Sequence, residues 1–202
     1  MHRQGHLTPV SPAQFIEDVL RNNHNRALLS RMAGWGLPDA WLVAGCLFQT
    51  VWNLRSGQPP EAQIKDYDLF YFDAGDLSEE AEQSVNRRLQ AACADLPIEI
   101  EAKNQARVHT WYPACFGHPY PALRDSRDGM NRFLVRCTCV GLQSSGNGGA
   151  IELYAPHGLD DLYGGMLSPN PLCDHPALFA AKAASYRARW PWLRTCAMAR
   201  DA

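Results

Sequence analysis

The sequence lacks the marks of several protein classes. No apolar stretch is long enough to span a bilayer, and the first residues lack the apolar centre of a signal peptide, so we expect no membrane segment and no leader. Lys and Arg form no run or stripe, and 19 of them against 21 acidic residues give a formal net charge of −2. This balance argues against an extended nucleic-acid surface.

A disulfide framework is also missing. The seven cysteines are odd in number and show no repeating spacing, which is typical of reduced thiols, so we expect a cytoplasmic protein. At 202 residues, 46% of them hydrophobic, the chain can bury a substantial core. We predict one domain over residues 1–202: a helical segment at about 11–34, a core at about 40–165 and a C-terminal helix at about 175–193.

Local signals support this division. Ser11 before Pro12, with Gln14 three residues after the serine, is a typical helix start. Residues 133–142 and 150–155 predict the two strands of a hairpin. The C-terminal helix has an apolar set that we expect to be buried, made up of Leu178, Phe179, Ala183 and Tyr186.

The most informative stretch is residues 65–73. Side chains alternate along a strand, so Asp66 and Asp68 share one face with Phe70. Aromatic and aliphatic residues occupy both faces, which predicts a central strand covered on both sides. Two neighbouring carboxylates repel each other unless a positive group neutralises them, and Mg²⁺ is one such group. A solvated strand end is the alternative interpretation.

An apolar strand at residues 41–44 leads into Gly45 and Cys46 and then into a helical pattern at 47–54. The start of a helix carries unpaired backbone N–H groups and binds anions. Glycine at such a junction can also serve tight packing alone. Together with the acid pair, this turn predicts a site for a nucleoside triphosphate.

Further acids follow at residues 97–102, where Glu99 and Glu101 alternate with apolar residues and share a face. One of them would complete a three-carboxylate site if this strand lies beside the Asp66–Asp68 strand. The alternative is the polar face of an edge strand. In residues 103–112, Arg107 and His109 would share a face of an extended segment, to grip phosphate or to form an interior network.

Several blocks resemble a bacterial family of small nucleotidyltransferase-like proteins within the DNA polymerase β-like nucleotidyltransferase superfamily. The resemblance covers about residues 12–193, and the blocks are Ala44-Gly45-Cys46, Gln49-Thr50-Val51-Trp52-Asn53, Lys65-Asp66-Tyr67-Asp68, Tyr71-Phe72-Asp73, Asn104-Gln105-Ala106-Arg107-Val108-His109, Pro156-His157-Gly158-Leu159-Asp160-Asp161-Leu162 and Trp190-Pro191-Trp192-Leu193.

The resemblance implies an α+β (α/β) fold, a mixed β-sheet flanked by α-helices. It also implies two Mg²⁺ ions, with Mn²⁺ as the alternative, held by the catalytic acids Asp66, Asp68 and Glu101, with Glu99 in reserve. The nucleoside triphosphate would be bound by Gly45, Cys46, Lys65 and Arg107. The implied reaction moves a nucleoside monophosphate to an acceptor of unknown class: a small molecule, RNA or protein.

Two positions depart from the superfamily pattern. Cys46 stands where Gly or Ser is usual, and Glu101 stands where a third aspartate is commoner. These departures leave open a second hypothesis, a catalytically inactive nucleotide- or metal-binding module of the same fold. The third hypothesis is a structural or interaction protein, in which the acids are only a polar strand end.

Overall fold

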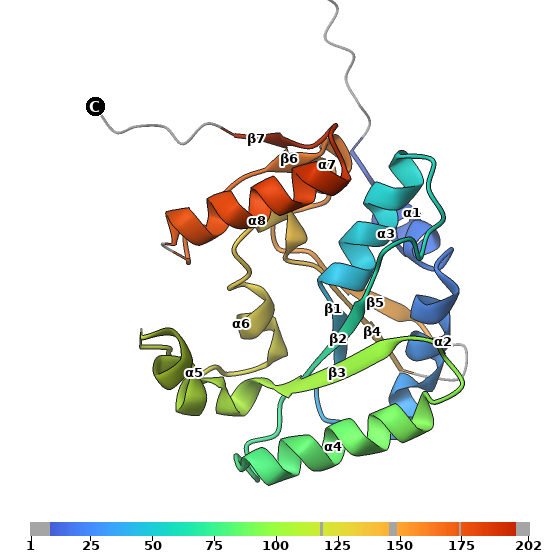
Figure 1. Cartoon of the computed structure of the whole chain (residues 1–202). Coiled ribbons are helices and arrows are strands. Elements are labelled where there is room, and N and C mark those ends of the chain that lie inside the picture. The colour runs from blue at the N-terminus through green and yellow to red at the C-terminus, as the bar shows by residue number, and fades with distance from the viewer. Residues whose placement is uncertain (1–8, 118, 146–148, 174, 197–202) are drawn as a thin grey trace, which may run out of the picture.

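A mixed five-stranded sheet forms the centre of the computed structural model, which describes residues 9–117, 119–145, 149–173 and 175–196 (Figure 1). Its strands are β1 (Trp41–Val43), β2 (Asp66–Tyr71), β3 (Glu99–Asn104), β4 (Gly141–Ser144) and β5 (Ile151–Tyr154). The order is β3-β2-β1-β4-β5; β2 and β3 are parallel and the other neighbours are antiparallel. The predicted α+β fold with a mixed sheet is therefore confirmed.

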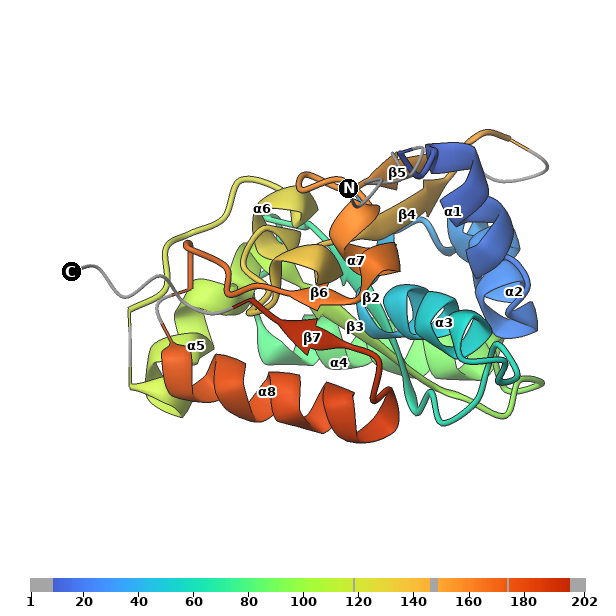
Figure 2. The same ribbon diagram turned by 90° about the horizontal axis from the view of Figure 1, so that it is seen from above.

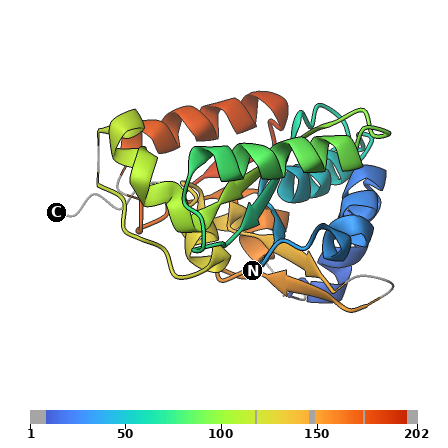
Figure 3. The ribbon, with the colours of Figure 1, turned by 90° about the horizontal axis from the view of Figure 1, so that it is seen from below.

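The α-helices are α1 (Pro12–Val19), α2 (Asn23–Arg31), α3 (Gly45–Arg55), α4 (Glu79–Ala92), α5 (Val108–Phe116), α6 (Ser126–Met130), α7 (Asp160–Gly164) and α8 (Pro176–Arg189). Single 3₁₀ turns are η1 (Met32–Trp35), η2 (Gln105–Arg107) and η3 (Arg136–Thr138), and β6 (Met166–Leu167) pairs with β7 (Arg194–Thr195). In Figure 1 α8 lies near the top of the view and α4 at the bottom, and Figure 2 and Figure 3 look at the molecule from these two ends.

The helix start at Ser11 is confirmed, since its hydroxyl accepts the N–H of Gln14 at 3.1 Å. The helical segment that follows is divided in two. Asn22 caps α2 by accepting the N–H of His24 at 2.9 Å. Among the described residues, no helix is both long enough and apolar enough to cross a membrane.

The two faces of the sheet differ in burial. On one face of β2, Tyr67, Leu69 and Tyr71 are buried in the main core. On the other face Asp66 is exposed and Asp68 and Phe70 are half-buried, so the prediction of a strand covered on both sides is wrong. That face packs only a small cluster around Trp41, Val43 and Met130 and borders a cavity beyond it.

Two other predictions need correction. The strand expected over residues 133–142 begins only at Gly141; before it the chain turns through η3, where the Thr138 hydroxyl donates to the Val135 carbonyl at 2.7 Å. Its hairpin pairing with β5 is confirmed. In α8, Phe179, Ala183 and Tyr186 are buried as predicted, but Leu178 is 51% exposed. All seven cysteines are free thiols.

Candidate active site

A tight turn joins β1 to α3 beside the acid pair. Ala44 has a positive φ of 52°, a backbone angle that residues other than glycine rarely adopt. Helix α3 begins at the next residue, Gly45. A Cβ at position 45 would lie 2.9 Å from the Gln49 amide nitrogen. Backbone strain of this kind gathers at functional sites. Glycine thus lets the chain turn closely against Gln49 and exposes the helix start to the cavity.

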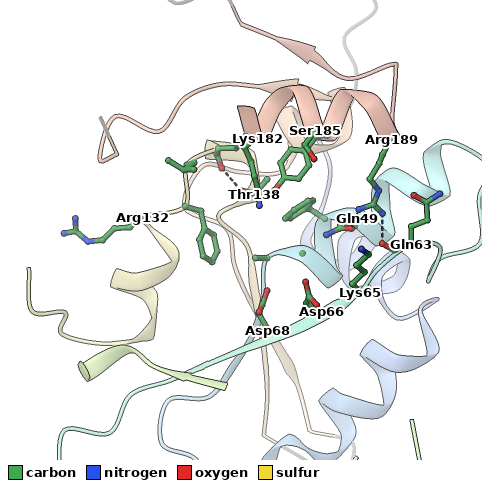
Figure 4. A pocket seen from close by; sticks show the side chains of 17 residues that line it. Gln49, Gln63, Lys65, Asp66, Asp68, Arg132, Thr138, Lys182, Ser185 and Arg189 are labelled. Carbon is green, nitrogen blue, oxygen red and sulfur yellow. Dashed lines mark hydrogen bonds between the residues drawn. The ribbon is translucent and has the colours of Figure 1, made fainter. Parts of the chain in front are cut away.

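Asp66 and Asp68 lie beside this turn because β2 is antiparallel to β1, with Asp68 opposite Val43. Figure 4 shows both carboxylates pointing into the same cavity. Burial, followed by repulsion from Asp66 and Glu101, raises the pKa of Asp68 to about 6, while Lys103 and Lys182 act in the opposite direction. The local field therefore favours a positive partner between these carboxylates.

The predicted third acid lies on the neighbouring strand. The parallel register sets Glu99 beside Asp66 and Glu101 beside Asp68, as the hypothesis required. Glu101, however, forms an ion pair with Lys103, in which Oε1 lies 2.6 Å from Nζ, and both side chains are partly exposed. In the part of the chain that the structure describes, no three His, Cys, Asp or Glu side chains are gathered closely enough to hold a metal ion. The role of Glu101 stays a prediction.

Above the acid pair lies a cavity of about 800 Å³, bounded by β2, the start of α3, residues 132–138 and α8. Four cationic side chains line it: Lys65, Arg132, Lys182 and Arg189. None of the four forms an ion pair with a carboxylate of the described residues. Lys65, Lys182 and Arg189 lie across the cavity from the two carboxylates, whereas Arg132 points away from them (Figure 4). Opposite charges across open space are the arrangement that an anionic ligand bridged by a cation requires.

Arg189 is held in place by α3 and the preceding loop. Its guanidinium donates to the Gln49 side-chain oxygen at 2.7 Å and to the Gln63 carbonyl at 3.0 Å. Its Nε is buried without a hydrogen-bond partner among the described residues. Since Gln49 also packs against Gly45, the glycine turn and the α8 cation form one unit.

Two predicted nucleotide-binding side chains do not face the cavity. The Cys46 thiol is buried and points back to the Val43 carbonyl at 3.6 Å, and burial raises its pKa well above its ordinary value. Arg107 lies past the other end of β3, where it pairs with Glu82 of α4 at 2.8 Å. The structure brings Gly45, Lys65, Asp66 and Asp68 together and leaves Arg107 outside.

The cations of α8 were missed by the sequence analysis. The residues of this helix that line the cavity are Lys182, Ser185, Tyr186 and Arg189. Their spacing of three, four and seven residues is that of one helix face. The sequence shows that these residues share a helix face, but it does not show that this face would cover the acid pair.

Comparison with known proteins agrees with the geometry. A solved structure titled "The NMR structure of the protein reveals a CCA-adding enzyme head domain" is 28% identical, has a TM-score of 0.74 and covers 92% of this chain and 96% of that one. Another, titled "tRNA-processing enzyme (apo form I)", is 14% identical with a TM-score of 0.49, over 94% of this chain and 46% of that one. No curated protein matches. Residues 30–195 match the family model described as "Nucleotidyltransferase", and the chain belongs to the nucleotidyltransferase family.

Proposed function

We propose that the protein transfers a nucleoside monophosphate from a nucleoside triphosphate to an acceptor with the help of Mg²⁺, or Mn²⁺ in its place. The observation that carries this proposal is the acid pair Asp66–Asp68, which shares one cavity with the Gly45 turn and with four cations that form no ion pair among the described residues. The match to an enzyme head domain, at 28% identity, supports the same class of reaction.

The donor set fits a divalent cation. Two carboxylates lie side by side, and their repulsion contributes to the raised pKa of Asp68. Asp66 and Asp68 would hold the ion, with Glu101 as the proposed third ligand. When bound, such an ion neutralises phosphate charge and polarises the reacting oxygens.

The protein's own groups then position the triphosphate. The start of α3 at Gly45 offers backbone N–H groups to phosphate oxygens. Lys65, Lys182 and Arg189 offer charge for the β- and γ-phosphates. In the reaction the acceptor oxygen forms a bond to the α-phosphorus, the bond to pyrophosphate breaks and pyrophosphate leaves with that electron pair. Glu101, in register with Asp68, is the proposed acceptor of the hydroxyl proton.

One observation favours the second candidate, a nucleotide-binding module without turnover. Glu101 is already paired with Lys103, and a third carboxylate held in this way would not complete the metal site. The substitution Lys103→Met separates the two candidates because it releases Glu101 from its ion pair. In an active enzyme the rate of nucleotide transfer should increase. In a module without turnover only the affinity for nucleotide or metal should change.

The direct test measures thermal unfolding with each of the four nucleoside triphosphates, with and without Mg²⁺, followed by transfer of an α-labelled phosphate. A ligand at a hundred times its dissociation constant stabilises by about 2.7 kcal/mol. Asp68→Asn should lose the Mg²⁺-dependent shift, whereas Asp73→Asn, a matched change beyond the other end of β2, should keep it. Absence of a shift with every nucleotide would reject both candidates.

A further inference from the structure

A second cavity lies on the same face of the sheet as the acids. Phe70, two residues after Asp68 on β2, lines it, and Lys103 does so from β3. Arg132, Phe133 and Leu134 line both cavities. Two residues of strand span only about 7 Å, so the second cavity begins next to the acid pair. Asp66 and Asp68 line the first cavity and not the second, and Phe70 is the β2 residue through which the second cavity approaches Asp68.

Aromatic side chains dominate the second cavity, which has a volume of about 390 Å³. Those that line it are Phe70, Trp111, Tyr112, Phe116, Tyr120 and Phe133. The Tyr112 ring lies 4.4 Å from the Tyr120 ring and 4.6 Å from the Phe116 ring, between centroids. The volume is that of a pocket for one small ligand. Phe116 and Tyr120 thus occupy the faces of Tyr112, and the ring open to a stacked ligand is that of Phe116, which is 52% exposed.

The exposure of apolar residues points to the same place. The described residues include four large apolar side chains that are exposed, and three of them line this cavity: Phe116 at 52%, Leu172 at 59% and Leu178 at 51%. Exposed apolar patches mark sites that a ligand or partner covers. This also explains why Leu178 departs from the predicted buried set of α8.

Charge distinguishes the possible occupants. The cations at this cavity are Lys103, already paired with Glu101, and Arg132. The Arg132 guanidinium lies over the Tyr120 ring at 5.5 Å, and its Nε is buried without a hydrogen-bond partner in the described residues. A polynucleotide needs a row of phosphate-binding cations. A single ring that carries a polar group matches this cavity better.

We propose that the aromatic cavity binds the acceptor, and that the acceptor is a small molecule with a planar aromatic or heteroaromatic ring and a nucleophilic hydroxyl group. The ring stacks on Phe116, which Tyr112 holds in place, Arg132 contacts its polar substituent, and the hydroxyl is directed toward Asp68. The acceptor role rests on the proposed transferase function; binding of the ring does not, because it needs no nucleotide.

The first experiment measures binding alone, by saturation-transfer NMR with tyrosol, pyridoxine and adenosine as ring probes and cyclohexylmethanol as the saturated control. A ring probe should bind saturably to the wild type and cyclohexylmethanol should not. Because ring stacking is the main contact, Tyr112→Leu and Phe116→Ala should weaken binding roughly tenfold. Tyr112→Phe keeps the ring, and Leu77→Ala removes the exposed apolar side chain that does not line the cavity; both should bind as the wild type does.

Other occupants give different results. Unchanged ring binding in Tyr112→Leu and Phe116→Ala, or no binding of any ring probe, overturns the proposal. So does binding of a single-stranded octanucleotide RNA that depends on Tyr112 while no single-ring probe binds. A wild-type dimer in analytical ultracentrifugation that becomes monomeric in Leu178→Ser would mean that a second copy covers the cavity, which also overturns it.

The second experiment adds α-labelled nucleoside triphosphate and Mg²⁺ and looks for labelled ring probe by chromatography. Label should appear on the bound probe in the wild type and be lost in Asp68→Asn, which should still bind the ring. Ring binding without label transfer overturns the acceptor role. If thermal shifts also reveal no nucleotide binding, the failure belongs to the transferase proposal; if nucleotide binds normally, it belongs to the acceptor assignment.

Discussion

Charged side chains lie at both ends of the β2–β3 pair, but they form ion pairs to different extents at the two ends. Beyond the end of β3, Arg107 donates to Glu82 at 2.8 Å and to the Leu77 carbonyl at 3.1 Å, and Glu82 also accepts the N–H of Asn104 at 2.7 Å. At the other end, Asp66 and Asp68 repel each other beneath cations that form no ion pair in the described structure. The charges beyond the end of β3 are therefore paired within the fold, whereas the acids and cations around Asp68 have the arrangement expected of the proposed ligand site.

The comparison is tested most strongly at the satisfied end. Arg107→Ala leaves Glu82 buried without its partner, so we expect a loss of about 3 to 5 kcal/mol in unfolding free energy, because breaking one side of a buried pair is costly. Urea denaturation measures this loss. The exposed pair Arg124–Asp128 is the control, since solvent screens it and Arg124→Ala should cost far less unfolding free energy than Arg107→Ala. Equal losses in the two variants would remove the contrast.

At the unsatisfied end the large effect should fall on activity. Asp68→Asn removes a charge that faces the cavity, and we expect nucleotide transfer to fall roughly 10²- to 10³-fold, as when one group that stabilises transition-state charge is removed. Its unfolding free energy should stay level or rise slightly, because repulsion from Asp66 and Glu101 is relieved. Transfer of α-labelled phosphate and thermal unfolding check the two parts. A variant that is both active and destabilised would make Asp68 a structural residue.

The pH dependence of stability offers a finer test. In the folded protein the pKa of Asp68 is raised to about 6, so between about pH 4 and pH 6 the folded state binds more protons than the unfolded state. Protonated Asp68 therefore stabilises the folded state fully below about pH 4, and this stabilisation is lost as the pH rises through 6. The unfolding free energy changes by at most about 2 to 3 kcal/mol. The difference between wild type and Asp68→Asn in urea titrations over this range isolates the effect. Parallel curves would contradict it.

The smallest effect concerns the helix that covers the acids. Lys182 of α8 lines the cavity, whereas Arg187 of the same helix is exposed and does not. Lys182→Met should weaken nucleoside triphosphate binding roughly tenfold, the loss of one charge-assisted hydrogen bond. Arg187→Met should leave binding unchanged. Isothermal titration with Mg²⁺ and nucleotide measures both, and equal weakening would mean that only the overall charge matters.

Local patterns predicted much of the fold. The alternation of Asp66 and Asp68 with buried residues, the glycine turn at 45 and the cap at Ser11 act through backbone geometry over a few residues, which the sequence displays directly. The failures involve distant neighbours. Residues 133–140 are apolar enough for a strand, yet their pairing there is an isolated antiparallel bridge between Val135 and Pro169. The chain then turns through η3 before β4 begins. Leu178 fits a buried helical pattern, but it borders a cavity.

The sequence by itself determined the family, the acid pair and its position beside a glycine turn, because residue type and short spacing carry that information. The tertiary structure alone decided which cations serve the acids. Arg107 is near Glu101 in the chain but lies beyond the other end of β3 with Glu82. Lys182 and Arg189 are more than a hundred residues from Asp68, yet α8 packs so that one of its faces covers the acid pair. Charge acts through space, and only the folded chain sets that distance.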